Sequence, residues 1–163
     1  AARAKLANAC VKAVVNAGFG NDPLVVGAEE GDSYVYKTKD HGKLSAAASA
    51  GLSLMWDTEL GLSHIDKFTY SSNEFVKAGA LLAYGILHNG VRTEMDAPLA
   101  LLSEHVESKS APLQHSSVVG LGLAYAGAHR EEVMALLLPY VQDESTSMST
   151  AALCALALGY VFI

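Results

Sequence analysis

The sequence predicts an all-α fold in which helical hairpins stack side by side as an α-solenoid, and two repeating patterns support this prediction. Residues 79–90, rich in glycine, alanine and leucine, return 37 residues later as 116–127, and the central glycine recurs after another 37 residues. The leucine-bearing triplets 99–101 and 136–138 are also 37 residues apart. A period of roughly 20 to 50 residues is typical of stacked units that bury apolar surface mainly against their neighbours.

The first twenty residues predict a single helix that packs on this array. Between Arg3 and Val15, alanine, leucine, cysteine and valine recur at helical spacing among polar residues, which indicates an amphipathic helix. Gly18 and Gly20 then end it, because glycine is a poor helix former. We therefore expect residues 1–20 to form one helix and its exit turn.

Residues 21–42 predict a loop excursion between this helix and the repeats. They contain an Asp-Pro pair and the acidic run at 29–32, both of which favour loop structure. Tyrosine alternates with other residues from Tyr34 to Lys37, so this stretch could form one short strand.

Residues 43–163 are expected to hold about three and a half helical hairpins, built from two alternating kinds of helix. Helices rich in small residues are predicted at 44–56, 73–87, 113–125 and 148–162, and leucine-bearing helices at 61–70, 97–107 and 130–141. The first hairpin is shorter, since Gly51 precedes Gly85 by 34 residues.

Recurring glycines indicate how the two kinds of helix are layered. Glycine inside a helix costs about 1 kcal/mol relative to alanine, so its recurrence at Gly51, Gly85, Gly122 and Gly159 needs a compensating contact. Close approach of neighbouring backbones supplies one, because glycine has no Cβ. The small-residue helices should therefore form a tightly packed inner layer. The leucine-bearing helices, which carry the charges, should form an outer, solvated layer that a partner can reach.

Composition and charge exclude several classes of function. The 163-residue chain has a net charge of −6 and no basic cluster that could follow a phosphate backbone, so no nucleic-acid partner is expected. Its longest uncharged apolar run, the last 13 residues, is shorter than the roughly 20 that span a bilayer, so no membrane partner is expected. Cys10 and Cys154 are expected to be reduced core thiols of an intracellular protein. The apolar end at Ile163 and the start without methionine predict a piece of a longer repeat protein.

Catalytic and metal-binding patterns are missing from the sequence. The six histidines form no His-Glu-x-x-His motif and no Cys/His pairs at zinc-ligand spacing, and no Gly-x-Ser-x-Gly nucleophile elbow occurs. We expect no catalytic, cofactor or metal site and no enzyme activity; the enzymatic alternative is Cys10 with His41 beside the excursion. Trp56 follows Leu52 and Met55 and is expected to close the core, with a partner anchor as the alternative.

The repeats resemble the proteasome/cyclosome repeat, most clearly at 77–85, 97–102, 120–127, 130–133 and 136–139. Other stretches narrow the resemblance to the smaller of the two large non-ATPase scaffold subunits in the base of the proteasome regulatory particle; they lie at 15–20, 39–42, 45–49, 56–57, 65–68 and 70–72. The resemblance implies a toroid of two concentric helix layers, a non-catalytic scaffold role and a location in cytoplasm and nucleus. The implied partners are ubiquitin chains, ubiquitin-like domains of shuttle factors, a deubiquitinase and the proteasomal ATPase subunits.

The resemblance also implies where ubiquitin binds. Members of this family use acidic residues beside apolar ones on consecutive outer helices, and the matching helix here is 97–107, which Asp96 precedes. At about 100° per residue, Asp96 and Glu107 point within about 20° of each other and Glu104 lies about 80° away, so the three predict an acidic stripe. The residues expected to widen this stripe on the neighbouring outer helices are Asp66, Glu131 and Glu132.

Two observations favour an alternative in which the outer face is purely architectural. Charges on an outer helix commonly serve solvation, and Glu131 and Glu132 in a first turn complement the helix dipole. Glu104 and His105 also stand where relatives commonly carry aspartate and tyrosine, so an aromatic contact is missing. The alternative function is therefore a repeat segment that contacts other subunits and does not bind ubiquitin.

Overall fold

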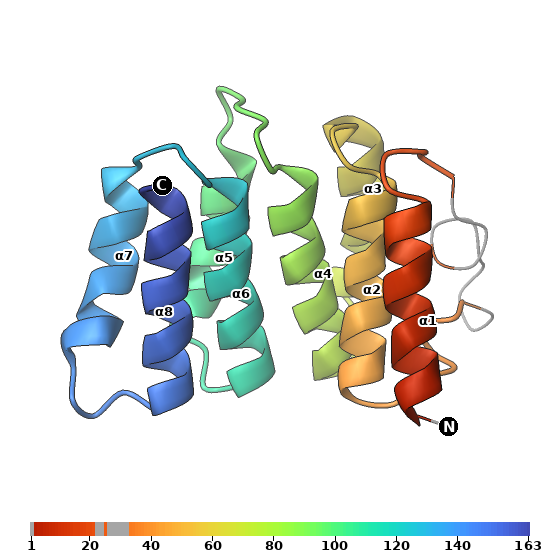
Figure 1. Cartoon of the computed structure of the whole chain (residues 1–163), viewed down its shortest axis with the longest axis horizontal. Helices are drawn as coiled ribbons and strands as arrows, with labels where there is room; N and C mark the ends of the chain where they lie inside the picture. The colour runs from red at the N-terminus through yellow and green to blue at the C-terminus, as the bar shows by residue number, and fades with distance from the viewer. Residues whose placement is uncertain (1, 22–24, 26–32) are drawn as a thin grey trace.

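Eight α-helices make up the part of the chain that the computed structural model describes, namely residues 2–21, 25 and 33–163 (Figure 1). They are α1 (Ala2–Val15), α2 (His41–Ser53), α3 (Thr58–Thr69), α4 (Glu74–Leu87), α5 (Ala97–Val106), α6 (Ala111–Ala124), α7 (Glu131–Gln142) and α8 (Met148–Val161). These residues include no strand, so the predicted all-α class is confirmed. The acidic run at 29–32 lies outside the described residues.

The helices form two layers (Figure 1). The helices α1, α2, α4, α6 and α8 pack on one another in that order and form the inner layer, while α3, α5 and α7 form the outer layer. Each outer helix packs on the inner helix that follows it in the chain: α3 on α4, α5 on α6 and α7 on α8. The helix α1 thus continues the inner layer beyond α2.

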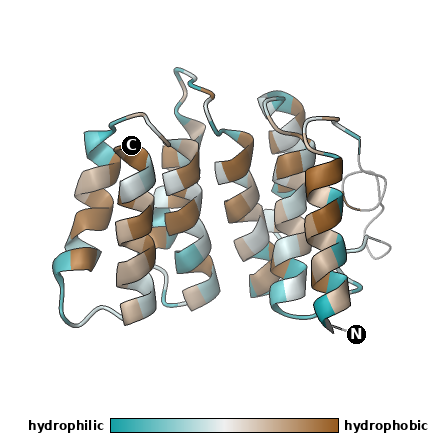
Figure 2. Ribbon diagram, viewed as in Figure 1, coloured by the Kyte–Doolittle hydropathy of each residue, from teal (hydrophilic) through white to brown (hydrophobic). Residues whose placement is uncertain are grey.

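Each outer helix buries one apolar stripe and turns the opposite side toward solvent. Figure 2 shows hydrophobic and hydrophilic residues together along α7. The buried stripes consist of residues three or four apart, namely Ile65 and Phe68 of α3, Leu102 and Val106 of α5, and Val133 and Leu137 of α7. Such spacing brings side chains to one face of a helix. The core therefore lies between the two layers, and the charged side chains of the outer helices remain accessible.

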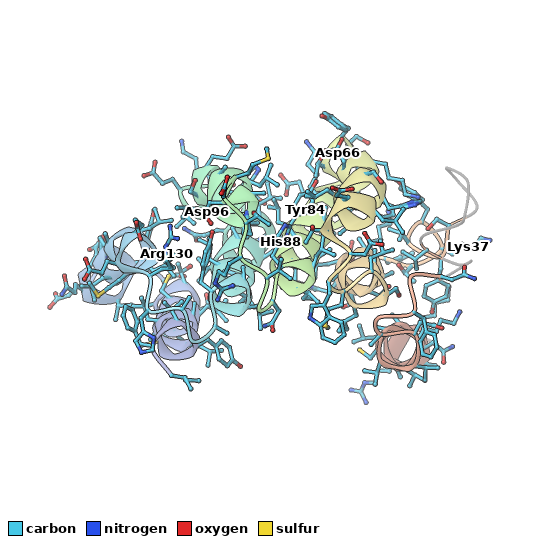
Figure 3. All side chains as sticks on the ribbon, turned by 90° about the horizontal axis from the view of Figure 1, so that it is seen from above. Lys37, Asp66, Tyr84, His88, Asp96 and Arg130 are labelled. Atoms are coloured by element: carbon cyan, nitrogen blue, oxygen red, sulfur yellow. The ribbon has the colours of Figure 1, made fainter. Side chains whose placement is uncertain are left out.

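Close backbone contact between inner helices, which stand in one row when viewed from above (Figure 3), accounts for the recurring glycines. A Cβ added to Gly85 would lie 2.3 Å from the Cα of Gly120, and one added to Gly51 would lie 2.5 Å from the carbonyl oxygen of Ala83. Carbon atoms pack at about 3.5–4.0 Å, so no side chain fits at either position. The predicted inner layer is confirmed here. Gly159 differs, because a Cβ there would meet nothing within 4 Å.

Loops join successive inner helices through hydrogen bonds. The loop after α1 donates two backbone N–H groups to the last turn of α2, and the loop after α6 does the same to α8. These bonds are 2.8–2.9 Å long and pair Gly18 with Leu52, Gly20 with Ser53, Gly127 with Tyr160 and His129 with Val161. The loop after α4 reaches the end of α6 through the side chains of Asn89 and Arg92. Because the last carbonyls of a helix have no intrahelical partner, the loops after α1, α4 and α6 each cap the next inner helix.

Trp56 does not close the core, so that prediction is wrong. Its side chain is 65% exposed, and its φ of 73° is a left-handed conformation. Trp56 follows the central glycine of its repeat by five residues, and Gly90 and Gly127 hold the equivalent positions in the next two repeats. These two glycines have φ values of 75° and 66°. The turns after α2, α4 and α6 thus share a left-handed residue at this position, and at Trp56 the side chain is largely exposed to solvent.

The N-terminal region differs from expectation in two further respects. Residues 34–37 form successive turns rather than a strand, and the last residues of the expected excursion already belong to α2, which begins at His41. Cys10 is exposed, whereas Cys154 is buried as expected. The helix α1 directs Ala9 and Ala13 into the core, so Cys10, one residue after Ala9, lies on the solvent side.

Candidate functional site

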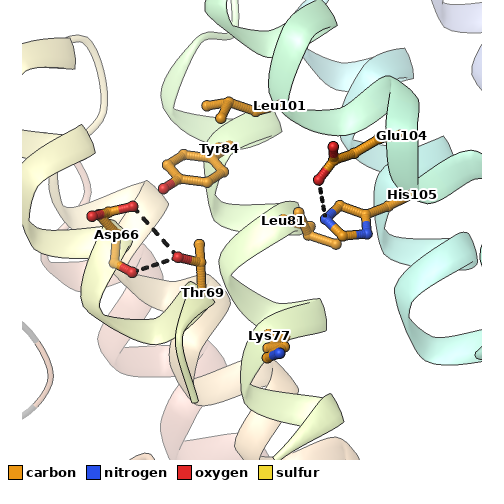
Figure 4. A pocket seen from close by; sticks show the side chains of 8 residues that line it. All are labelled: Asp66, Thr69, Lys77, Leu81, Tyr84, Leu101, Glu104 and His105. Atoms are coloured by element: carbon orange, nitrogen blue, oxygen red, sulfur yellow. Dashed lines mark hydrogen bonds and ion pairs between the residues drawn. The ribbon is translucent and has the colours of Figure 1, made fainter. Parts of the chain in front are cut away.

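A groove between the outer helices α3 and α5 is where predicted acidic residues meet accessible apolar surface (Figure 4). Its volume is about 280 Å³, and α4 forms its floor. The lining residues are Asp66 and Thr69 of α3, Lys77, Leu81 and Tyr84 of α4, and Leu101, Glu104 and His105 of α5. The groove therefore combines a largely apolar floor with a carboxylate on each rim.

The α3 rim is organised around Asp66. The hydroxyl of Thr69 donates to the backbone carbonyl of Asp66 at 2.7 Å and lies 3.4 Å from Oδ1 of the same residue. Tyr84 is buried and directs its hydroxyl toward Asp66 (Figure 4). Burial raises the pKa of Tyr84 well above its usual range, and the negative charge of Asp66 raises it further. Tyr84 therefore remains a neutral phenol beside the carboxylate of Asp66.

The α5 rim presents an aliphatic side chain beside a carboxylate. Leu101, Glu104 and His105 are three and four residues apart, so they share one face of α5. Leu101 is 38% exposed, and the Glu104 side chain is 74% exposed. The imidazole Nε2 of His105 lies 3.3 Å from Glu104 Oε1. A ligand in the groove could therefore contact Leu101 and the carboxylate of Glu104 at the same time.

Asp96 does not join this exposed surface, although the helical spacing places it on the predicted stripe. It precedes α5 in a left-handed conformation, with φ and ψ both 44°, and its side chain is only 31% exposed. Its Oδ2 accepts a hydrogen bond from Arg130 Nη2 at 2.7 Å, and its Oδ1 accepts the hydroxyl of Tyr125. Both carboxylate oxygens thus bind residues at the junction of α6 and α7, and Asp96 links neighbouring repeats.

The cluster around Asp96 continues through Tyr125, whose side chain is buried. Burial and the hydrogen bond to Asp96 raise the pKa of Tyr125 well above its usual range. The guanidinium carbons of Arg92 and Arg130 lie 5.7 and 5.5 Å from its ring centroid. Arg130 Nε also donates to Glu132 Oε2 at 3.0 Å. Two arginines, two carboxylates and one phenol thus fix the loop before α5 against the start of α7.

The other predicted acidic residues are exposed. Glu107 directly follows α5 and lies near Tyr140 of α7, where burial, followed by the charge of Glu107, raises the pKa of Tyr140. Glu131 and Glu132 occupy the first turn of α7. The structure thus brings Asp66 and Glu104 together at the groove, while Glu107 and the two α7 glutamates lie toward the next outer helix.

Sequence reasoning missed the floor of the groove and the partners of Asp96. Leu81 and Tyr84 belong to the inner helix α4. The repeat pattern predicts that a partner reaches only the outer layer, so it does not place these two residues in a site. Leu101 stands three residues before Glu104, so its position on the same face of α5 was available from helical spacing. No local pattern connects Arg130 with Asp96, which are 34 residues apart.

Two observations on the described part of the chain concern metal binding and thiol chemistry. Within it, no group of three or more histidine, cysteine or acidic side chains could hold a metal ion. Burial raises the pKa of the Cys154 thiol to about 11, so it is not a thiolate nucleophile at neutral pH. None of the helices in this part combines the length and apolar character needed to cross a membrane.

Comparison with known proteins agrees with the repeat architecture. The family profile described as "Proteasome/cyclosome repeat" matches residues 116–150. The chain is 43% identical over 164 aligned residues to "26S proteasome regulatory subunit rpn-1" of Neurospora crassa and 45% identical over 162 to "26S proteasome non-ATPase regulatory subunit 2" of Dictyostelium discoideum. It is 46% identical over 162 residues to "26S proteasome regulatory subunit rpn1" of Schizosaccharomyces pombe. Each alignment covers 99% of this chain and 18% of the relative.

The fold and these matches define the class: the chain belongs to the proteasome/cyclosome repeat proteins, with two layers of alternating helices. Within this class, it is related along almost its whole length to the non-ATPase regulatory subunit of the 26S proteasome that the three relatives represent. The chain spans about 18% of the length of these relatives.

Proposed function

We propose that the chain is a non-catalytic scaffold segment of the proteasome regulatory particle that docks ubiquitin or ubiquitin-like domains on its outer helices. The observation that carries this proposal is the groove between α3 and α5, where Leu81, Tyr84 and Leu101 lie between the carboxylates of Asp66 and Glu104. The relatives are named as regulatory subunits of the 26S proteasome, which supports the scaffold role.

The chemistry of the groove matches a ubiquitin-like surface. The recognition face of ubiquitin is apolar and ringed by basic side chains, so carboxylates on both rims would steer encounter and set orientation. The aliphatic contact with the exposed Leu101 would supply most of the affinity, because exposed ion pairs contribute only about 0–1 kcal/mol each. Lys77 at the floor and Arg130 beside Asp96 limit the acidic surface to the rims.

The predicted acidic residues take different parts in this proposal. Asp66 and Glu104 contact the partner at the groove, and Glu107, Glu131 and Glu132 extend the negative surface toward α7. Asp96 contributes by holding the loop before α5 against α7. Shuttle factors and a deubiquitinase would reach the same surface through their ubiquitin-like domains, and the proteasomal ATPase subunits would contact the whole protein elsewhere.

A titration of ¹⁵N-labelled chain with ubiquitin, and separately with a ubiquitin-like domain, tests the proposal. We expect the Asp66→Lys and Glu104→Lys substitutions each to weaken binding about fivefold. Leu101→Ala should weaken binding at high salt as well, because an apolar contact is not screened. The matched control is Glu144→Lys, since Glu144 is an exposed glutamate outside the groove. Unchanged affinity in the Asp66→Lys/Glu104→Lys double variant would remove the site. No response to ubiquitin or the ubiquitin-like domain would instead favour a purely architectural segment.

A further inference from the structure

A second and larger groove lies at the end of the array formed by α1 and α2. It runs between the first turns of α1 and residues 36–42, which lead into α2, and its volume is about 710 Å³. This volume is within the range of about 300–1,000 Å³ that is typical of ligand pockets. The groove is separate from the site between α3 and α5, with which it shares no residue.

Hydrogen bonds hold the two walls of this groove together. The hydroxyl of Tyr34 donates to the carbonyl oxygen of Lys5 at 2.9 Å, and Lys5 Nζ donates to the carbonyl oxygen of Lys37 at 2.9 Å. Lys12 Nζ also lies 4.9 Å from the centre of the Tyr34 ring. Val35, between these contacts, is fully buried. The turn that carries Lys37, at one end of the array in Figure 3, is therefore fixed to α1, and the groove is already formed without a ligand.

The charge of this groove is opposite to that of the whole chain. Four of the 11 lysine and arginine residues line it, and they are Arg3, Lys5, Lys37 and Lys39. Among the described residues of the lining, the single carboxylate is Asp40, whereas the chain as a whole has a net charge of −6. Asp40 precedes α2 without capping it through its side chain, so the partial positive charge at the start of α2 adds to the basic lining. Such local positive charge favours an anionic partner.

The lining also contains apolar surface, which distinguishes the groove from a simple anion site. Leu6 is 40% exposed there, and the half-buried Tyr36 lies on the opposite wall. An inorganic anion or a phosphate backbone would leave these side chains uncovered. A peptide that carries carboxylates next to a large apolar side chain would satisfy both the basic and the apolar parts of the groove.

We propose that this groove binds an acidic peptide segment of a partner protein. Carboxylates of the segment pair with Arg3 and Lys39, which are both exposed, and a leucine or phenylalanine side chain packs between Leu6 and Tyr36. The groove is a second interaction surface at the α1 end of the array, apart from the ubiquitin-like docking surface between α3 and α5. Its existence does not depend on whether that docking occurs.

Fluorescence anisotropy with the 163-residue chain and a fluorescein-labelled peptide, Asp-Glu-Asp-Leu-Phe-Asp-Glu-Asp, tests this proposal. We expect binding that weakens about fivefold with Arg3→Glu and again with Lys39→Glu, and that weakens as salt is raised because screening shortens the range of the attraction. Lys109→Glu is the matched control, since Lys109 is exposed and lies outside the groove. Circular dichroism of each variant verifies that the helices are intact.

Two control peptides separate the proposal from its rivals. A peptide with asparagine and glutamine in place of the acids should bind at least tenfold more weakly, and so should an acidic peptide with Ser-Ser in place of Leu-Phe. Equal binding of the uncharged peptide would overturn the charge argument, and equal binding of the Ser-Ser peptide would show a simple anion site instead. A loss with Lys109→Glu as large as that with Lys39→Glu would also overturn the proposal, because net charge alone would then explain binding.

Discussion

Replacement of Asp96 tests the link between neighbouring repeats. Asp96→Ala removes the acceptor of the buried Tyr125 hydroxyl and the carboxylate that pairs with Arg130. It also places alanine at a position with φ of 44°. Asp96→Asn keeps one oxygen acceptor for the Tyr125 hydroxyl, and asparagine tolerates the left-handed conformation. It removes the charge and the second oxygen, which accepts from Arg130. The two substitutions therefore separate the hydrogen bond and the backbone from the ion pair.

The structure sets the expected size of these effects. A hydrogen bond that involves a charged group is worth about 1.5–3 kcal/mol, and alanine in a left-handed conformation costs about 1 kcal/mol. The Arg130 and Asp96 side chains are 33% and 31% exposed, so their ion pair adds at most about 1 kcal/mol. We expect Asp96→Ala to lower the free energy of unfolding by about 3–4 kcal/mol and Asp96→Asn by about 1 kcal/mol.

Urea denaturation followed by circular dichroism measures both values. A double-mutant cycle with Tyr125→Phe should give a coupling free energy of at least about 1 kcal/mol, because the two side chains share one hydrogen bond. Equal losses for the alanine and asparagine variants would refute the assignment of most of the effect to the Tyr125 bond and the backbone. Additive losses in the cycle would refute the bond itself.

Three further predictions concern packing, the left-handed turn and the thiols. Gly85→Ala should cost about 3 kcal/mol in urea denaturation, because its Cβ would meet backbone atoms that cannot move aside, while Gly159→Ala should stabilise by about 1 kcal/mol because its surroundings are open. Trp56→Gly should stabilise by about 1 kcal/mol, since it relieves a left-handed conformation at an exposed side chain; a loss in the same assay would mean that the indole contributes packing. A thiol reagent should modify Cys10 quickly and Cys154 only on unfolding. Burial raises the pKa of Cys154 to about 11, so the neutral thiol should stabilise the fold fully below pH about 8.5, and this contribution to the free energy of unfolding should be lost as pH rises toward 11.

The repeat pattern made the layers predictable, because a glycine in the middle of a helix has few reasons to recur. Gly51, Gly85 and Gly122 each lie against the backbone of the next inner helix, as the spacing indicated. The exposure of Trp56 was harder to predict, since an apolar side chain after an apolar helix end normally packs inward. Trp56 aligns with Gly90, and the structure shows that both residues have a left-handed conformation in equivalent turns. The sequence alone does not show these conformations.

The candidate site was predictable on its rims and not on its floor. Asp66 and Glu104 lie at accessible positions of outer helices, so the amphipathic pattern placed them in solvent. Asp96 has the same charge and a suitable helical angle, yet it is held by Arg130 and Tyr125 from the next repeat. The angle of a residue around its own helix does not show whether another helix places a cation beside it, as Arg130 is placed beside Asp96.

The loops that cap the next inner helix give the array a polarity along the chain. The end of α2 depends on the loop after α1, and the end of α8 depends on the loop after α6. When an upstream loop detaches, carbonyl groups at the tip of the downstream helix lose their donors and must be rehydrated. Fraying of the α1 loop therefore exposes the end of α2, and fraying of the α6 loop exposes the end of α8, whereas fraying at α8 leaves the ends of α2 and α6 capped.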